Sequence, residues 1–457
     1  MKYLFITIIL SSVVFFSSCK KWLDVDPRTV VKEEEIFQDD QGFRTALFGI
    51  YTKIASRDLY GANLTIGYLD VLAQYYAVES SQHSFYSYSQ YNHAERRSIP
   101  DAIWRTAYSA ITNCNNLLQH LVGKEAMFSM GEYKLIKGET LALRAILHFD
   151  VLRMYAPSYN VNPSGYGIPY VDKVSNQPFP QLTVEETLRA VKADLEAALA
   201  LLKESDPWSL HYDGIAGPIA DLPNHLSFRV ERMNYYAVLG TLAKVNLYMN
   251  NKQEAYKNAF EVLEAKPSGI LFSLFTNKSW DNSDLYFNTE ASANSKLIVP
   301  QGRKNEYYET SLYGSIDSRY KDWFKYYPGS NEEYMSKYMR SVPQNGNPPN
   351  IILLRSEEMS YILAETATTE TEALAELNRI RARYGIGTAH RLVEGVAVLD
   401  EEIMKEYRKT FIGEGQFFYY LKRKKINPIP YSLIGDVAKA YILPIPELEK
   451  EFGNIKQ

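Results

Sequence analysis

Apolar side chains recur three or four positions apart over long stretches of this chain, which is the spacing of one face of an α-helix. The clearest run follows Thr183, and its apolar positions are Val184, Leu188, Val191, Leu195, Ala198 and Leu202. Thr183 and Glu186 have the spacing of a capping box, in which each side chain accepts a hydrogen bond from the other residue's backbone N–H. The sequence therefore predicts that an amphipathic helix begins here.

Similar patterns predict further helices, most of them in pairs. Residues 138–155 form a second strong helical segment, which Pro157 stops. The other predicted helices are residues 40–55 with 103–121, 233–249 with 253–264, and 355–368 with 371–384. We expect Gly385 to close the last of these, because glycine readily takes the left-handed conformation that ends many helices.

One of these pairs has the spacing of a tetratricopeptide repeat. Tyr236, Leu239-Gly240, Tyr256 and Ala259 stand at the aromatic, Leu-Gly and small-residue positions of such a repeat, although Ala243 replaces a usual aromatic. Helix pairs of this kind cannot bury their faces alone and therefore stack on one another. We predict a mostly α fold with about four stacked pairs.

The segments between the helices have a different composition. Residues 58–100, 157–180, 206–224 and 267–350 are rich in Tyr, Ser, Asn, Gly or Pro. Irregular segments as long as the last one usually carry function or form a small subdomain. The pattern therefore predicts a helical scaffold with a large irregular, loop-rich face.

The first residues have the pattern of a secretory signal peptide. An apolar run from Leu4 to Phe16 follows a basic start and ends in small residues before Cys19. Its length falls short of the roughly 20 residues that a membrane-spanning helix needs. We predict that residues 1–18 are removed and that residues 19–457 form the mature chain. An ordinary cleavage that leaves Cys19 as an incidental thiol is the alternative.

Charge and cysteine content narrow the function classes. The chain has 50 basic and 54 acidic residues, so no overall positive field attracts nucleic acid. Cys114 is the only cysteine besides Cys19 and is predicted to be a buried, inert thiol. The basic run 422–425 is interpreted as a solvated helix end. The chain has 36 Tyr against 20 Phe and 5 Trp, and this excess of Tyr favours a solvent-exposed recognition surface.

Several stretches resemble the SusD/RagB family of nutrient-binding outer-membrane lipoproteins. In chain order they are residues 22–27 (WLDVDP), 43–54, 104–118, 143–155 (LRAILHFDVLRMY), 407–423 (YRKTFIGEGQFFYYLKR) and 443–447 (LPIPE). The chain departs from the family at Tyr407, Gln416 and Tyr420, where Glu, Arg and Asp are usual, and it lacks the typical Asn-Pro-Gly-Tyr tail. The departures put local ion pairs in doubt and leave the expected fold unchanged.

This resemblance implies both a location and a role. Members carry lipid on a cysteine after a lipobox, which Phe16-Ser17-Ser18-Cys19 resembles. Attachment of several acyl chains, such as palmitate, would anchor Cys19 stably to the outer membrane. Members act as a lid on a TonB-dependent transporter and capture a glycan or peptide. We therefore expect an oligosaccharide-binding, surface-exposed lipoprotein, with oligopeptide binding or a non-nutrient docking scaffold as alternatives.

Two aromatic segments supply the groups that saccharide capture needs, namely flat apolar rings with amides or carboxylates nearby. The first offers Tyr75, Tyr76, Tyr86, Tyr88, Tyr91 and Asn92, the second offers Trp280, Asp281 and Tyr286, and Trp323 follows further on. In order along the chain these regions resemble the family's ligand-contacting loops. Alternatively, most of these rings pack the loops onto the scaffold.

Features of an enzyme are few. The chain contains no His-Glu-x-x-His, Gly-x-Ser-x-Gly or phosphate-binding glycine loop, and its seven histidines form no helical metal pair. His148 is interpreted as a packed, hydrogen-bonded imidazole, and Glu414 as part of a turn that follows a helix. We therefore predict a protein that catalyses no reaction and uses no cofactor or metal.

Overall fold

The computed structural model describes residues 33–93, 95–129, 131–211, 226–265, 269–275, 294–326, 333–338 and 350–456. The predicted signal peptide and Cys19 lie outside these residues, as do Trp280, Asp281 and Tyr286. Within the described ranges, no helix combines the length and the apolar character needed to cross a membrane.

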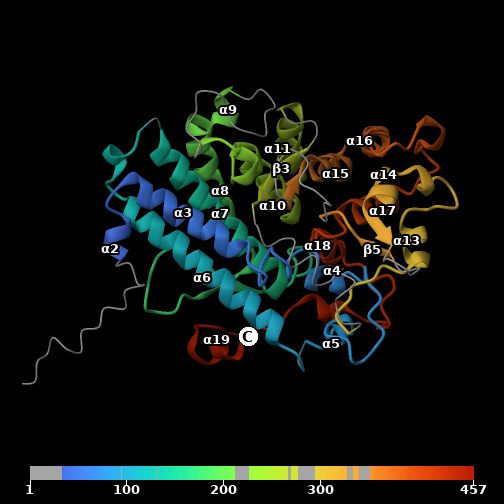
Figure 1. The fold of residues 1–457 in the computed structure, drawn as a ribbon, viewed down its shortest axis with the longest axis horizontal. Coiled ribbons are helices and arrows are strands. Elements are labelled where there is room, and N and C mark those ends of the chain that lie inside the picture. The colour runs from blue at the N-terminus through green and yellow to red at the C-terminus, as the bar shows by residue number, and fades with distance from the viewer. Residues whose placement is uncertain are drawn as a thin grey trace, which may run out of the picture.

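Eight long helices form the scaffold as four consecutive pairs (Figure 1). They are α3 (Asp40–Ile54) with α6 (Ser98–Leu121), α7 (Glu132–Tyr155) with α8 (Val184–Ser205), α10 (Tyr235–Tyr248) with α11 (Lys252–Ala265), and α15 (Ser356–Thr366) with α16 (Glu370–Arg383). Contacts between α6 and α7, α8 and α10, and α11 and α15 join each pair to the next. The predicted mostly α fold of stacked pairs is confirmed.

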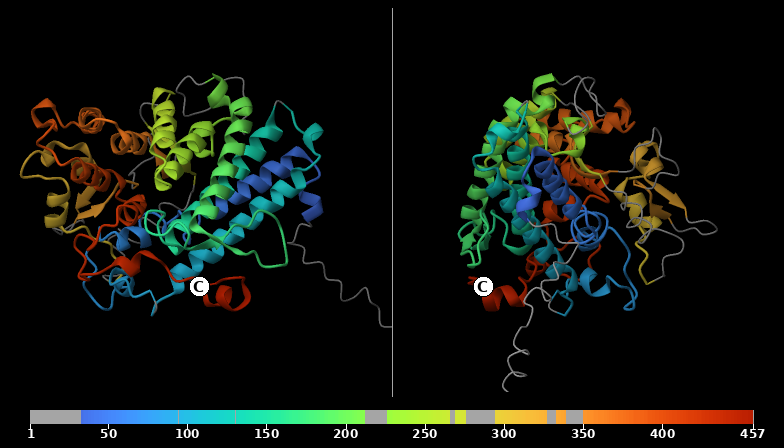
Figure 2. Two further views of the ribbon diagram at one scale, coloured as in Figure 1. Left: turned by 180° about the vertical axis from the view of Figure 1, so that it is seen from behind. Right: turned by 60° about the vertical axis from the view of Figure 1, so that its left-hand side comes forward.

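Further helices and turns lie before, between and after these eight helices. Outside the pairs, α17 (Leu399–Phe411) is a further helix of 13 residues. The short helices are α2 (Glu33–Ile36), α4 (Tyr68–Leu72), α5 (Tyr86–Ser89), α9 (Pro207–His211), α13 (Gln301–Tyr307), α14 (Ser318–Asp322), α18 (Gln416–Arg423) and α19 (Glu447–Phe452). The single 3₁₀ turns are η2 (Glu125–Met127), η4 (Arg229–Glu231), η5 (Gly314–Ile316), η7 (Thr388–His390) and η8 (Ala438–Tyr441). The right-hand view of Figure 2 shows α7 and α8, in teal and green, on one side and the segment around residues 294–326, in gold, on the other.

The described strands form three small antiparallel sheets of two strands each. They are β1 (Tyr166–Pro169) with β2 (Gln181–Thr183), β3 (Ile270–Leu274) with β6 (Ile351–Arg355), and β4 (Phe324–Tyr326) with β5 (Glu333–Met335). The β3–β6 sheet closes the two ends of the long irregular segment 267–350 against each other. This segment is therefore an insertion whose base is fixed on the scaffold.

The predicted capping box and apolar face of α8 are confirmed. The Glu186 N–H donates to Thr183 Oγ1 at 3.2 Å, and the Thr183 N–H donates to Glu186 Oε2 at 2.9 Å. All six apolar positions that predicted this helix are 0% exposed. Helix α7, in contrast, begins at Glu132 and not at residue 138, because Leu135 and Ile136 continue its buried face for two more turns.

Two glycines shape the helical layer as the sequence predicts. A Cβ atom at Gly240 of α10 would lie 2.9 Å from Leu354 Cδ2, so this glycine permits close packing of α10 on β6. Gly385 follows α16 with φ +86°, and the Ile386 N–H donates to the Arg381 carbonyl at 3.0 Å. That bond is the signature of a Schellman motif, which ends the helix.

Candidate ligand-binding face

Residues 294–298, which follow the second aromatic segment, are hydrogen-bonded to residues 77–84 of the first. The Ala77 N–H donates to the Ile298 carbonyl at 3.0 Å, and the Ser84 N–H donates to the Asn294 carbonyl at 2.8 Å. The imidazole of His83 bonds the carbonyl of Lys296 through Nε2 at 2.9 Å. Residues 294–298 directly follow the stretch that carries Trp280, Asp281 and Tyr286, so the chain leaves that stretch beside the first segment.

Helix α13 strengthens this junction from the same side. Arg303 Nη1 donates to the carbonyls of Gln74 and Tyr76, at 3.2 and 3.0 Å, and the Tyr307 hydroxyl donates to the Gln74 carbonyl at 3.1 Å. The Arg303 guanidinium also lies 5.0 Å from the ring centre of Tyr431. The role of Arg303 was not predictable from the sequence, because a lone cation in an irregular segment gives no local signal of its partners.

Four of the predicted ligand-binding tyrosines are buried. Tyr75, Tyr76, Tyr88 and Tyr91 are 1%, 2%, 1% and 8% exposed. Three of their hydroxyls donate to backbone carbonyls, and that of Tyr88 bonds the hydroxyl of Ser98 at 3.0 Å. These rings hold the loop on the scaffold, which is the packing alternative, and in this arrangement their faces are closed to a ligand.

Tyr86 and Asn92 remain partly exposed at the junction. Tyr86 is the first residue of α5, and its N–H donates to the carbonyl of His83 at 2.9 Å. The Asn92 N–H donates to the Ser87 carbonyl at 2.9 Å, which folds the chain back on α5. Tyr86 and Asn92 thus belong to one compact turn, which follows the bond from Ser84 to Asn294, and the Tyr86 ring packs partly against the core.

Trp323 is partly exposed and lies over buried charges in a different part of the insertion. Its ring centre is 4.1 Å from Lys337 Nζ and 5.9 Å from the ring centre of Tyr384. Lys337 forms an ion pair with Glu414 at 2.5 Å, and Arg355 pairs with the same carboxylate. Burial lowers the pKa of Lys337 to about 8, although the charge of Glu414 acts in the opposite direction.

Glu414 has a structural position, as predicted. It is 2% exposed and lies in the turn between α17 and α18. Asp70 holds this turn by accepting hydrogen bonds from the N–H groups of Gly413 and Gly415, at 2.6 and 3.1 Å. Burial raises the pKa of Asp70 well above its ordinary value, and those two hydrogen bonds oppose the shift.

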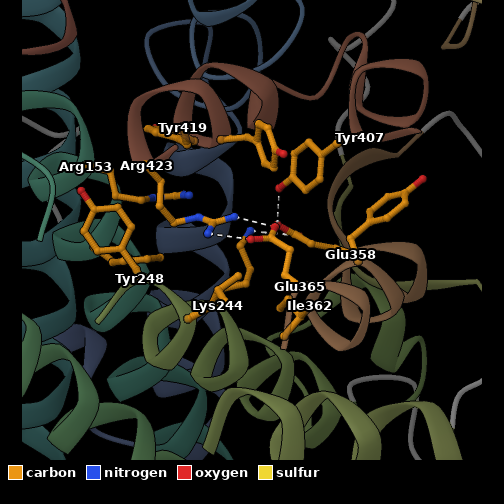
Figure 3. A pocket seen from close by; sticks show the side chains of 13 residues that line it. Arg153, Lys244, Tyr248, Glu358, Ile362, Glu365, Tyr407, Tyr419 and Arg423 are labelled. Carbon is orange, nitrogen blue, oxygen red and sulfur yellow. Dashed lines mark hydrogen bonds and ion pairs between the residues drawn. The ribbon is translucent and has the colours of Figure 1, made fainter. Parts of the chain in front are cut away.

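A polar cavity lies at the centre of the molecule, between α7, α10, α15, α17 and α18 (Figure 3). In it Glu358 accepts from the Tyr407 hydroxyl at 2.9 Å and pairs with Lys244 at 3.1 Å, while Glu365 pairs with Arg423 at 2.7 Å. Its volume is about 30 Å³. Space of this size suits one or two water molecules and cannot hold a sugar ring.

Two of the three residues that depart from the SusD/RagB pattern, Tyr407 and Tyr420, line this cavity. The rings of Tyr407 and Tyr420 stack with centres 4.7 Å apart, and Gln416 accepts a hydrogen bond from Lys244 at 3.0 Å. Tyr407 and Gln416 thus remain bonded to charged partners, Glu358 and Lys244, although neither side chain is itself charged. The expected fold is confirmed with these three residues in place.

Cys114 and His148, whose side chains could in principle react or bind a metal, are both buried. Cys114 is 0% exposed, and burial raises the pKa of its thiol to about 12. His148 is also 0% exposed, and burial lowers the pKa of its imidazole to about 3. Both predictions of structural roles are confirmed. Among the described residues, no three His, Cys, Asp or Glu side chains are placed to hold a metal ion.

The basic run 422–425 is not the solvated helix end that the sequence predicts. Lys422 is 3% exposed and donates to two backbone carbonyls, and Arg423 pairs with Glu365. Only Lys425 is exposed. The prediction was wrong because the acceptors come from α7 and α15, far away in the sequence.

Comparison with known proteins gives one consistent likeness. Residues 21–212 match a SusD-like family model described as "Starch-binding associating with outer membrane". A "SusD-like protein P25" of Formosa agariphila is 23% identical over 152 residues, which are 31% of this chain and 28% of that protein. The chain therefore matches well under two thirds of this curated relative.

Solved structures extend the likeness in fold to most of the chain. A SusD superfamily protein from Bacteroides thetaiotaomicron has a TM-score of 0.71 at 22% identity, covering 91% of this chain and 98% of that one. A "putative sugar binding protein" from Bacteroides vulgatus has a TM-score of 0.70 at 22% identity, covering 91% and 97%. At such identities the likeness establishes the fold.

Proposed function

We propose that this chain, which is similar to SusD-like proteins in sequence over residues 21–212 and in fold over most of its length, binds oligosaccharide at its loop-rich face. The bound glycan would then pass to a TonB-dependent outer-membrane transporter for uptake. Binding and release would suffice for this role, without catalysis.

The observation that carries the proposal is the junction between the two aromatic segments. Backbone bonds from Ala77 and Ser84 place residues 294–298 beside α5. Tyr86 and Asn92 then supply a partly exposed ring and an amide there. A sugar stacks its apolar face on such a ring and bonds its hydroxyls to such an amide. Trp280, Asp281 and Tyr286, which lie outside the described residues, are proposed as further contacts from the second segment.

The descriptions of similar proteins name the same ligand class. The matching family model is described as starch-binding, and one similar structure is described as sugar-binding. The family description also includes association with the outer membrane. We extend both properties to this chain as part of the proposal.

The anchor in this proposal is lipid on Cys19, with the protein exposed at the cell surface. The test is expression of Cys19→Ala and of the unaltered chain in a bacterium that acylates lipoproteins, followed by detergent phase partition. We expect the unaltered chain in the detergent phase and the variant in the aqueous phase. Partition of the variant into detergent would exclude a lipid anchor on Cys19.

Ligand binding is tested by a thermal-shift panel on the chain lacking residues 1–19. The panel contains plant, host and microbial glycans and a peptide digest. A ligand that binds only the folded state raises the melting temperature. A reproducible increase with one glycan class supports the proposal. An increase with peptides alone would replace it by oligopeptide binding, and no increase with any glycan at millimolar concentration would favour a docking scaffold.

A further inference from the structure

A second cavity lies at the carboxyl end of α7, away from the junction just described. Its volume is about 320 Å³, which is at the lower end of the range for small-molecule sites. The lining comes from the segment after α7, from the end of α18 and from η8. Its residues are Pro157, Ser158, Val161, Lys422, Lys425, Asn427, Ala438, Tyr441 and Ile442.

Lys422 forms part of the floor of this cavity. It is 3% exposed, and its Nζ donates to the carbonyls of Arg153 and Ala156, at 2.6 and 2.7 Å. These carbonyls belong to the negative end of α7, which a cation caps favourably. In the described part of the chain no carboxylate forms an ion pair with Lys422. Burial lowers the pKa of its amine well below the ordinary value, and the nearby charge of Arg153 lowers it further.

Ser158 adds an unused hydrogen-bonding group to the same cavity. It is 2% exposed, and its Oγ has no hydrogen-bond partner among the described residues. A buried hydroxyl without a partner is unfavourable, which makes it a natural point of contact for a ligand atom. Lys425 stands exposed on the rim. The lining thus holds two lysines and a free hydroxyl, with no acidic residue.

The walls of the cavity are apolar. Val161 is 59% exposed and Ile442 is 37% exposed, while the Tyr441 ring is buried behind them with its hydroxyl bonded to the Ile426 carbonyl at 2.6 Å. Exposed aliphatic side chains at the mouth of a cavity gain free energy when a hydrocarbon covers them. The site therefore combines a cationic, donor-rich floor with apolar walls.

We propose that this cavity binds a small monocarboxylate with an apolar tail. The carboxylate would accept hydrogen bonds from Lys422 Nζ and Ser158 Oγ, and the tail would cover Val161 and Ile442. Lys422 lies between such a ligand and the negative end of α7, so the carboxylate meets the ammonium group and not the helix carbonyls. Charge excludes the opposite class, because an organic cation would face two lysines without a counter-charge.

Calorimetric titration of the mature chain, residues 19–457, with sodium hexanoate tests this proposal. We expect saturable binding at one site. 1-Hexanol should bind at least about tenfold more weakly, because it lacks the charge. Glucuronate, which has the charge but a polar body, should not bind. Equal affinity for hexanol, preference for glucuronate, or no heat with hexanoate would each overturn the proposal.

Variants locate the site. Val161→Asp places a carboxylate at the mouth of the cavity, and Ser158→Ala removes the free hydroxyl. Hexanoate affinity should fall about tenfold or more with Val161→Asp. Val174→Asp is the matched control, because Val174 is 47% exposed and does not line the cavity. This variant should bind hexanoate with the same affinity as the unaltered chain. Equal weakening by both aspartates, or by neither, would contradict a site at this position.

Discussion

Arg319 and Glu406 form an ion pair of 2.8 Å in which both side chains are 0% exposed. The same carboxylate pairs with Arg381 and Lys409, each at 3.0 Å. Burial raises the pKa of Glu406, but the three positive charges outweigh that effect and hold it well below the ordinary value. Three buried cations from α14, α16 and α17 thus share this carboxylate, and two of them also pair with Asp317 and Glu309. The network ties the insertion to the last helical pair.

Replacement of this carboxylate should be strongly destabilising. Glu406→Gln leaves the three cations without their shared counter-charge, and removal of one partner from a buried ion pair costs about 3–5 kcal/mol. Urea denaturation measures the free energy of unfolding. Glu185→Gln breaks the exposed pair with Arg189 and serves as control, with an expected change of about 1 kcal/mol or less. A loss no larger than the control's would contradict a structural role for the network.

His148 should remain neutral far below the pH at which a free histidine is protonated. Its Nδ1 bonds the Arg144 carbonyl at 2.9 Å, and its Nε2 accepts the Val171 N–H at 3.0 Å, so an added proton would break the second bond. The pKa of His148 is about 3 in the folded protein, whereas that of an unfolded histidine is about 6.5. Between these two pH values the unfolded state therefore binds more protons than the folded state. This contribution to stability is complete above pH 6.5 and is lost as the pH falls toward 3.

Nitrogen NMR of the imidazoles tests this prediction, with His148→Asn used to assign the signal. At pH 5 the signal should be that of a neutral ring protonated on Nδ1. A midpoint near 6.5 in the folded protein would show that the ring is not buried as described.

Cys114 should not react with a thiol reagent while the chain is folded. Burial raises its pKa to about 12, and the thiolate is the reactive form. In the chain lacking residues 1–19 it is the single cysteine. Ellman's reagent should therefore detect no thiol at pH 7.5 in native buffer and one per chain in denaturant. Rapid native reaction of one thiol would contradict this placement.

Gly415→Ala should disrupt the turn that precedes α18. Gly415 has φ +68°, and an added Cβ would lie 2.1 Å from the Leu64 carbonyl oxygen, which is backbone and cannot rotate away. We expect a loss of about 3 kcal/mol or more in the free energy of unfolding. Gly435→Ala, where an added Cβ meets nothing within 4 Å, should change it by about 0.5 kcal/mol or less. Similar values for the two variants would contradict the described turn.

The helices were predictable because their signals are local. The capping box at Thr183 and the Schellman glycine at position 385 each involve residues within a few positions of one another. Helix spacing likewise identified three of the four pairs outright. The early start of α7 was missed because the apolar positions before residue 138 are few.

The proposed ligand-binding face was only partly predictable, because it depends on contacts between distant segments. Nothing near Ala77 indicates that its N–H pairs with Ile298. Likewise the sequence cannot distinguish Tyr88, which is buried, from Tyr86, two residues earlier, which is partly exposed. The prediction that Lys422 is solvated was wrong for the same reason. A lysine at a helix end is usually solvated, but the two carbonyls that accept from Lys422 lie at the end of another helix.

The central claim is that oligosaccharide binds at the junction of the two aromatic segments. Titration calorimetry of Tyr86→Ala, with the glycan class that stabilises the unaltered chain, tests it most directly. We expect affinity to fall by about 1–3 kcal/mol, the usual effect of removing a central aromatic contact. Tyr256→Ala removes a tyrosine that is 38% exposed on α11 and should leave affinity unchanged. Unchanged affinity in Tyr86→Ala, with its fold intact, would contradict a binding site at this junction.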